Sequence, residues 1–284
     1  MSEKIGVPDI RSRKGGPKLS MVTAYDFPTA VIADRAGIDM ILVGDSVSNV
    51  VHGHPNTLPI GMDVMVLHTK AVSRAEPRAL LVGDMPWLSY HVSVEDSVRN
   101  AGRLVAEGGA EAVKVEGGRK RIPAITAMLE AEIPVMGHLG LTPQSVHAMG
   151  GFKVQGKAVE AAQELIADAQ ALAAAGVFAI VIEGVPDIVG EIITKEVDVP
   201  TIGIGAGPGT DGQVLVFHDV LGLGFGFSPK FVRQYATLGE DAVAALGRFI
   251  EDIASGAFPG DAEAYHVSDE VAAELLKGRA SKEG

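Results

Sequence analysis

Eight short apolar runs recur along the chain, and each is bounded by turn signals. Most of them are rich in Val and Ile and show no alternation of polar and apolar residues. Strands buried on both faces have this composition, because helices cover both sides of a parallel sheet. The runs cover residues 18–26, 40–45, 79–86, 111–118, 133–140, 178–185, 200–207 and 213–219.

Segments with helical spacing separate these runs. In residues 93–109, Ser93 is a candidate N-cap, Asp96 follows three positions later, and the apolar residues fall on one face. Residues 157–176 are rich in Ala and end at Gly176, a natural helix terminator. Shorter helices fit residues 28–37, 61–76, 121–132 and 186–197. Eight strand–helix units predict an α/β fold, the (β/α)8 TIM barrel of about 250 residues, with a doubly wound open sheet as the alternative.

Two further helices are expected beyond the eighth strand, over residues 239–256 and 267–280. We therefore predict one barrel domain over about 18–256 and a C-terminal helical extension over about 257–284. The second helix could pack on a neighbouring subunit, although no local pattern requires it.

Composition excludes several classes of protein. The chain of 284 residues carries a formal net charge of −12, which argues against a broad nucleic-acid surface. It has no cysteine, so disulfides, thiolate nucleophiles and cysteine metal sites are excluded. No apolar signal region or stretch of about 20 apolar residues is present, so we predict a cytoplasmic protein that does not enter a membrane.

Charged residues stand where the predicted strands end. In a parallel barrel these carboxyl ends meet at one rim, so the acids would repel one another and resist burial. A hard divalent cation with oxygen ligands resolves that conflict, and Mg²⁺ suits a few carboxylates together with water and substrate. The polar residues at these ends are Asp26, Asp45, Asp84, Lys114, Glu116, His138 and Glu183.

Each of these residues also has a purely structural interpretation. Asp45 and Asp84 could cap the helices that follow, but two "VGD" turns beside "KVEGG" favour metal ligation. Lys114 and Glu116 are two positions apart in a strand and so point to the same side, where Lys114 could form an ion pair in the barrel interior.

Glu183 follows four apolar residues, and partial burial would raise its pKa and make it a competent general base; an ion pair with a helix is the alternative. His138 could contact the substrate, support a neighbouring group or simply pack as a neutral histidine. The remaining histidines are scattered and are taken as non-catalytic.

The run "GIGAGPGTDG" contains a G-x-G-x-x-G pattern at Gly207, Gly209 and Gly212. A dinucleotide-binding pattern must open a helix, whereas this one leads into another apolar strand. We expect a glycine-rich loop at the rim, close to the substrate.

A divalent cation beside a glutamate base is suited to a 2-oxo acid, since the metal polarises the carbonyl and stabilises an enolate formed by loss of the neighbouring proton. Residue chemistry alone leaves the electrophile open.

Several long blocks in order, from Leu19 to Ala236, resemble the ketopantoate (3-methyl-2-oxobutanoate) hydroxymethyltransferase family. They include "ILVGDSVSNVVHGHPNTLPIGMDVMVLHTKAV", "AVKVEGG", "HLGLTPQSVHAMGGFKVQGK" and "TIGIGAGPGTDGQVLVFHD". The resemblance implies a barrel of the phosphoenolpyruvate/pyruvate class, with Mg²⁺ as cofactor and 5,10-methylenetetrahydrofolate as co-substrate. It also implies hydroxymethyl transfer to 3-methyl-2-oxobutanoate, the first step of pantothenate synthesis, and a homo-oligomer, commonly a decamer.

Carried over by matching motif, Asp45, Asp84 and Glu116 would surround Mg²⁺. Ser46 and Lys114 would contact the keto acid together with Asp45 and Asp84, and His138 would lie nearby. Glu183 would accept the proton. The pattern departs from the family at Gly184 and at Pro208-Gly209, neither of which is a proposed ligand.

Two other hypotheses remain open at this point. One is a Mg²⁺-dependent lyase or mutase acting on another 2-oxo acid in the same barrel class, although such lyases generally use a cysteine-containing loop. The other is a barrel that binds a metabolite or assembles without catalysis, which the acids at the strand ends argue against.

Overall fold

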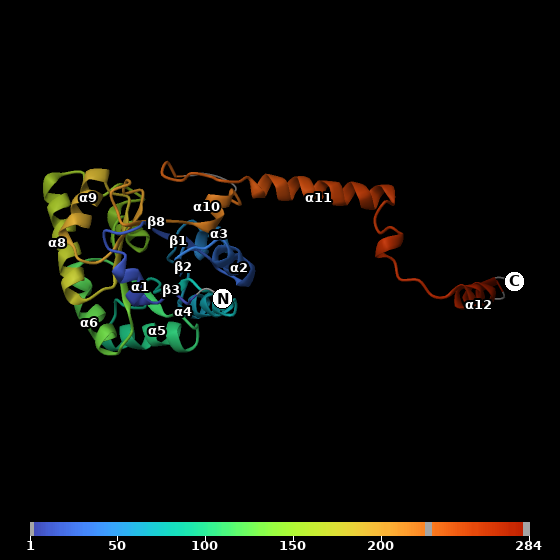
Figure 1. The fold of residues 1–284 in the computed structure, drawn as a ribbon, viewed down its shortest axis with the longest axis horizontal. Helices are drawn as coiled ribbons and strands as arrows, with labels where there is room; N and C mark the ends of the chain where they lie inside the picture. Colours follow the sequence, from blue (N-terminus) through green and yellow to red (C-terminus); the bar gives the residue numbers. More distant parts are fainter. Residues whose placement is uncertain (1–2, 225–228, 281–284) are drawn as a thin grey trace. The chain divides into compact units, whose positions relative to one another are not determined.

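Eight parallel strands form a closed barrel, in which each strand pairs with the next and β8 pairs with β1. The computed structural model describes residues 3–224 and 229–280. The closed barrel confirms the predicted fold and rules out the open sheet (Figure 1). The strands are β1 (Leu19–Thr23), β2 (Met40–Val43), β3 (Leu80–Asp84), β4 (Ala112–Glu116), β5 (Val135–Gly140), β6 (Ala179–Glu183), β7 (Thr201–Ile204) and β8 (Gly212–Leu215).

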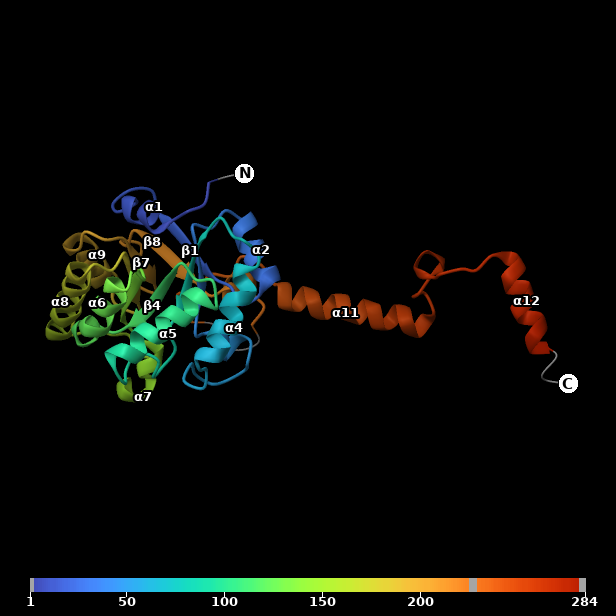
Figure 2. The same ribbon diagram turned by 90° about the horizontal axis from the view of Figure 1, so that it is seen from below.

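A ring of helices covers the outside of the barrel (Figures 1 and 2). The outward-facing strand residues, such as Ile41, Val113 and Ile180, are fully buried against these helices. The longer helices are α2 (Phe27–Arg35), α4 (Met62–Ser73), α5 (Val94–Ala106), α6 (Ile122–Glu130), α8 (Val159–Ala175) and α9 (Asp187–Glu196). Shorter segments are α3 (Val47–Val50), α7 (Val146–Met149), α10 (Phe217–Leu221), η1 (Arg119–Arg121) and η2 (Pro143–Ser145).

The inward-facing residues change from apolar to polar along the strands. Met40, Leu80 and Met136 belong to an apolar cluster inside the barrel. At the carboxyl ends the inward positions become charged, and the register places Asp84 beside Lys114 on neighbouring strands. The polar layer therefore rests on a closed apolar interior.

A short N-terminal helix, α1 (Val7–Ser12), closes the opposite end of the barrel. Its Ile10 is 1% exposed and packs in the interior cluster with Leu19 and Met40. Figure 2 shows α1 at one end of the barrel and α7 at the other. The sequence analysis did not anticipate this helix, which leaves the charged rim as the end available for chemistry.

The connection between the seventh and eighth strands agrees with the expectation that the glycine run leads directly into another strand. Residues 205–211, all of them described, connect β7 to β8 without a helix. A Cβ on Gly207 would lie 2.4 Å from the Cβ of Asp187, and one on Gly209 would lie 2.9 Å from that of Glu191, both in α9. These glycines allow the backbone to pack closely against α9. Their contacts explain two of the glycines in the run by packing, and the expected closeness of this loop to the substrate stays a prediction.

The C-terminal part forms a second compact unit, Thr237–Gly284, separate from Met1–Ala236. It contains α11 (Leu238–Ser255), η3 (Asp261–Glu263) and α12 (Asp269–Ala280). The first unit thus ends earlier than the predicted barrel boundary of about 256, and α11 belongs to the second unit. Residues 281–284 of the predicted extension lie outside the described residues. Within the described part of the chain, no helix has the length and apolar character needed to cross a membrane.

Asp211 joins three segments at the N-terminal end of the barrel. Its Oδ2 lies 2.9 Å from Lys14 Nζ and accepts a hydrogen bond from the Thr201 backbone at 2.9 Å, and its Oδ1 accepts one from the Gly15 backbone at 3.0 Å. Burial alone would raise the pKa of Asp211, but Lys14 and these backbone donors outweigh it and lower the pKa.

We predict that Asp211→Asn lowers the free energy of unfolding by about 2 kcal/mol, since it removes charged hydrogen bonds and leaves Lys14 unpaired. Because the folded-state pKa is lowered, the stabilisation is present above the unfolded pKa of about 4 and is lost as pH falls through the folded value. Urea unfolding at pH 7 and at pH 3 measures both effects. The difference between wild type and variant should shrink at pH 3, and an unchanged difference would contradict this account.

Candidate active site

The charged residues predicted from the strand ends meet inside the rim formed by β3, β4, β5 and β6. Lys114 Nζ lies 2.9 Å from Asp84 Oδ1 and 3.7 Å from Glu116 Oε1. His138 Nδ1 lies 3.4 Å from Glu116 Oε1, and its Nε2 lies 3.2 Å from Glu183 Oε2. The strands therefore bring five of the predicted residues into one continuous network.

Asp45 and Ser46 reach the same site from the turn after β2. The Asp45 backbone N–H donates to Asp84 Oδ2 at 3.0 Å, and its own side chain is buried. Asp45 does not cap α3, whose N-cap is Ser46. Ser46 Oγ lies 2.8 Å from the hydroxyl of Tyr25, a residue to which the sequence analysis assigned no role.

Asp26 has a structural role instead. Its Oδ1 accepts a hydrogen bond from the Thr29 backbone at 2.8 Å, and the residue is the N-cap of α2. Asp26 is also solvent-exposed, unlike the acids of the network. The capping interpretation that was weighed for Asp45 and Asp84 is therefore the one that applies to Asp26.

Two buried residues that the sequence analysis missed hold the acids in place. Gln144 Nε2 donates to Asp45 Oδ2 at 3.0 Å, and the Gln144 backbone N–H donates to Glu116 Oε2 at 3.1 Å. The Tyr90 hydroxyl donates to Gln144 Oε1 at 2.6 Å. A lone Gln and a lone Tyr in separate loops give no pattern in the sequence, so only the fold reveals this connection.

Burial and charge act in opposite directions on the acids. Burial raises the pKa of Asp45 well above its ordinary value, and the Asp84 and Glu116 carboxylates raise it further. Burial also raises the pKa of Asp84, although Lys114 partly compensates. Burial alone would raise the pKa of Glu116, but His138 and Lys114 lower it below its usual range. Without a further cation, the network resists carrying its full negative charge.

The two cationic groups are stabilised by the same acids. Burial alone would lower the pKa of Lys114, but Asp84 and Glu116 raise it above its usual value. For His138, burial and the Lys114 ammonium oppose protonation, yet the Glu116 and Glu183 carboxylates raise its pKa to about 9. Lys114 and His138 therefore both carry positive charge at neutral pH.

The donor set is suited to a divalent cation. The four carboxylates of Asp45, Asp84, Glu116 and Glu183 outnumber the two cations, Lys114 and His138. Asp84 Oδ1 and Glu116 Oε1 are buried and accept no hydrogen bond of good geometry within the described residues. Carboxylate oxygens with free lone pairs are the ligands that Mg²⁺ takes. Across residues 3–224 and 229–280, however, no group of three or more acids or histidines is arranged so that it could hold a metal ion with the side chains as they stand.

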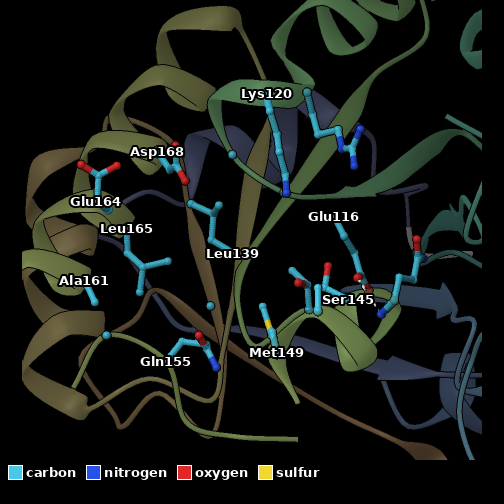
Figure 3. A pocket seen from close by; sticks show the side chains of 18 of the residues that line it. Glu116, Lys120, Leu139, Ser145, Met149, Gln155, Ala161, Glu164, Leu165 and Asp168 are labelled. Atoms are coloured by element: carbon cyan, nitrogen blue, oxygen red, sulfur yellow. Dashed lines mark hydrogen bonds between the residues drawn. The ribbon is translucent and has the colours of Figure 1, made fainter. Parts of the chain in front are cut away.

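A cavity of about 460 Å³ opens beside this network (Figure 3). Glu116, Gln144 and Tyr90 form part of its wall, so the cavity adjoins the charged rim. The loops after β4 and β5 and the side of α8 form the remainder.

Comparison with known proteins places the chain in a family. The sequence model described as "Ketopantoate hydroxymethyltransferase" matches residues 4–261. The chain belongs to the ketopantoate hydroxymethyltransferase family. A 3-methyl-2-oxobutanoate hydroxymethyltransferase from Syntrophobacter fumaroxidans is 54% identical over 99% of this chain and 100% of its own length. One from Moorella thermoacetica is also 54% identical, over 92% of this chain and 98% of its own length.

Solved structures with the same fold are more distant in sequence. A phosphonopyruvate hydrolase, in complex with oxalate and Mg²⁺, superposes with a TM-score of 0.59 at 16% identity, covering 97% of this chain and 96% of its own. A 2,3-dimethylmalate lyase of the PEP mutase/isocitrate lyase superfamily gives 0.55 at 16% identity, covering 97% and 98%. These likenesses establish the barrel class of this ketopantoate hydroxymethyltransferase family member, while the family match identifies it as an enzyme that transfers a hydroxymethyl group.

We predict that Gln144→Ala lowers hydroxymethyl transfer by roughly 10-fold to 100-fold, the usual cost of removing a group that orients ligand side chains. The variant leaves Asp45 Oδ2 without its amide donor and removes the acceptor of Tyr90. Steady-state kinetics measures the effect. Gln170→Ala on exposed α8 is the matched control and should retain wild-type activity. Equal rates for both variants would show that Gln144 does not position the acids.

Proposed function

We propose that this enzyme transfers a hydroxymethyl group from 5,10-methylenetetrahydrofolate to 3-methyl-2-oxobutanoate. One water molecule is consumed and supplies the new hydroxyl group; the products are 2-dehydropantoate and tetrahydrofolate, and the reaction begins pantothenate synthesis. The names of the family and of its close relatives support the acceptor and the transferred group. The observation that carries the proposal is the buried excess of carboxylates around Lys114 at the barrel rim, beside a cavity large enough for a second substrate.

Asp45, Asp84 and Glu116 are the residues that would hold Mg²⁺. Their side chains are buried, and Asp84 Oδ1 and Glu116 Oε1 are in contact only with the cationic groups of Lys114 and His138 among the ion pairs of the described residues. When bound, Mg²⁺ would hold the keto acid by its oxygens and stabilise the negative charge that develops as the C3 proton is lost. The complex of a structural relative with oxalate and Mg²⁺ agrees with this donor chemistry.

Glu183 is the residue best placed to accept the C3 proton. Its side chain is 15% exposed, whereas those of Glu116 and Asp84 are 3% and 1% exposed. A base must reach the proton that it removes, so the most accessible acid of the network is the natural candidate. His138 Nε2 lies 3.2 Å from Glu183 Oε2 and would hold the Glu183 carboxylate in position.

Lys114 and Ser46 complete the keto-acid site in this proposal. Lys114 is held between Asp84 and Glu116, and its charge favours a bound carboxylate or keto oxygen. Ser46 Oγ is kept in place by the Tyr25 hydroxyl and lies next to Asp45 in the chain. Both residues provide donors at fixed positions, which is what stabilises charge as it develops on an oxygen.

Proton NMR of 3-methyl-2-oxobutanoate in D₂O tests the proposal directly. With enzyme and Mg²⁺, the C3 proton signal should disappear, and EDTA should prevent this loss. Addition of formaldehyde and tetrahydrofolate should then produce 2-dehydropantoate. Exchange without transfer would reject the folate donor, and the absence of exchange with any divalent metal would reject the metal-and-base mechanism.

We predict that Glu183→Gln retains keto-acid binding but lowers C3 proton exchange by roughly 100-fold to 10,000-fold, the usual contribution of a general base. The neutral amide preserves the shape of the side chain and cannot take the proton. Binding is followed by calorimetry and exchange by NMR. Glu130→Gln, an exposed position on α6, serves as the matched control. Exchange at the wild-type rate in Glu183→Gln would identify another residue as the base.

We also propose that the chain works as a homo-oligomer, in which α11 packs against another copy. Along this helix, a stripe at helical spacing exposes Val243, Leu246, Phe249, Ile250 and Ile253. An exposed apolar stripe of this kind is typical of an interaction surface. The family resemblance implies a ring-type assembly, commonly a decamer.

We predict that Ile250→Glu shifts the protein toward smaller assemblies, because a charge in an apolar contact must be desolvated. Size-exclusion chromatography with light scattering gives the mass. Ala244→Glu adds the same charge to the opposite side of α11 and should leave the mass unchanged. A wild-type protein that is monomeric at micromolar concentration would reject the oligomer.

A further inference from the structure

The cavity beside the charged network has a wall that the keto-acid site does not use. One end is formed by Glu116, Gln144 and Tyr90, which belong to the rim network. The other end is the exposed side of α8, with Ala161 and Leu165. Figure 3 shows these two ends on opposite sides, with Leu139 between them. A molecule that fills the cavity would therefore extend from the reacting centre toward the surface.

The size and lining of the cavity are suited to a flat organic molecule. Its volume of about 460 Å³ lies in the range of roughly 300–1,000 Å³ that holds drug-sized ligands, which is more than a small keto acid needs. The apolar part of the wall, which can pack against a ring system, consists of Leu139, Ala148, Met149, Ala161 and Leu165.

The wall of the cavity also contains two cationic side chains that are not paired with an acid in the described residues. The acids Glu164 and Asp168 in its wall are both paired with Arg119. Glu116 is already in contact with Lys114 and His138. By contrast, Lys120 and Arg121 form no ion pair with an acid in the described parts of the chain.

Both of these cations face the cavity. Lys120 extends toward its middle in Figure 3. Arg121 lies over the Tyr90 ring, 5.5 Å from the centroid, and its Nε is buried without an acceptor within the described residues. Burial and the positive charges of Arg121 and Lys120 together lower the pKa of the adjacent His91 to about 4. Lys120 and Arg121 therefore provide local positive charge that an anionic group could pair with on this side of the cavity.

We propose that this cavity binds the one-carbon donor, a reduced pterin ring carrying an aminobenzoyl-glutamate tail. The apolar wall packs against the flat part of the donor, and Lys120 and Arg121 pair with its carboxylates. The carbon to be transferred lies at the Glu116 end, where the cavity meets the keto-acid site. The inference rests on the proposed folate-dependent transfer and assigns that co-substrate to particular residues.

Two variants with matched controls test the assignment. Lys120→Ala removes an exposed cation and should raise the KM for tetrahydrofolate roughly tenfold or more, the effect of losing a charged contact. Ala161→Trp adds bulk at an exposed position of the wall and should also raise this KM. The controls are Lys70→Ala on α4 and Ala174→Trp on α8, both exposed and outside the cavity, which should match the wild type. Circular dichroism verifies that every variant is folded.

A ligand without the tail separates the role of Lys120 from a general disturbance. With 6-methyltetrahydropterin and formaldehyde as donor, Lys120→Ala should behave like the wild type, because this donor has no carboxylate to pair. Ala161→Trp, which blocks space, should weaken the use of both donors. C3 proton exchange, which uses no folate, reports on the keto-acid site in each variant.

The possible results distinguish an error in the assignment of the cavity from an error in the identity of the donor. A raised KM for tetrahydrofolate in both cavity variants, with normal controls, supports the assignment. Wild-type KM values in both variants, from an enzyme that does transfer, would place the donor elsewhere and overturn the assignment alone. No transfer by the wild-type enzyme, despite proton exchange, would overturn the folate donor and the assignment with it.

Discussion

The site depends on one buried lysine. Lys114 stands in an otherwise apolar strand and is 3% exposed. Such a group is stable only with carboxylates around it, and Asp84 and Glu116 provide them. Conversely, these acids could not remain together in a barrel interior without a cation. The buried lysine and the buried carboxylates therefore stabilise each other. The remaining excess of negative charge is what a divalent metal would neutralise under the proposed function.

The barrel makes the charged network accessible from one end only. Apolar residues fill the interior below the network, and α1 closes that end with Ile10. The charged layer consequently has water and substrate on one side only, where the loops after the strands can cover it. Gln144 and Tyr90 come from two of these loops, so the positions of the acids depend on loop residues as well as on the strands.

The sequence predicted the barrel and the group of rim residues because both depend on short-range patterns. A doubly buried strand has a recognisable composition, and the parallel arrangement brings strand ends together regardless of distance in sequence. The positions of the strand ends were enough to identify the rim residues Asp45, Asp84, Lys114, Glu116, His138 and Glu183. Gln144 and Tyr90 were not, because their roles arise from contacts between loops that no local period encodes. The packing of Gly207 and Gly209 against α9 was not predicted for the same reason, because it is a contact between two separate segments.

In the proposed reaction the two substrates have different requirements, which the charged network and the neighbouring cavity would meet separately. Proton removal from a keto acid requires concentrated charge, which the buried network at the strand ends provides through groups with shifted pKa values. A large folate requires area and a few well-placed cations, which the more exposed loops and α8 around the cavity would provide under this proposal. Glu116 belongs to both regions, since it pairs with Lys114 and also lines the cavity. A new carbon–carbon bond would form at that boundary, because only there can the deprotonated keto acid and the donor carbon come into contact.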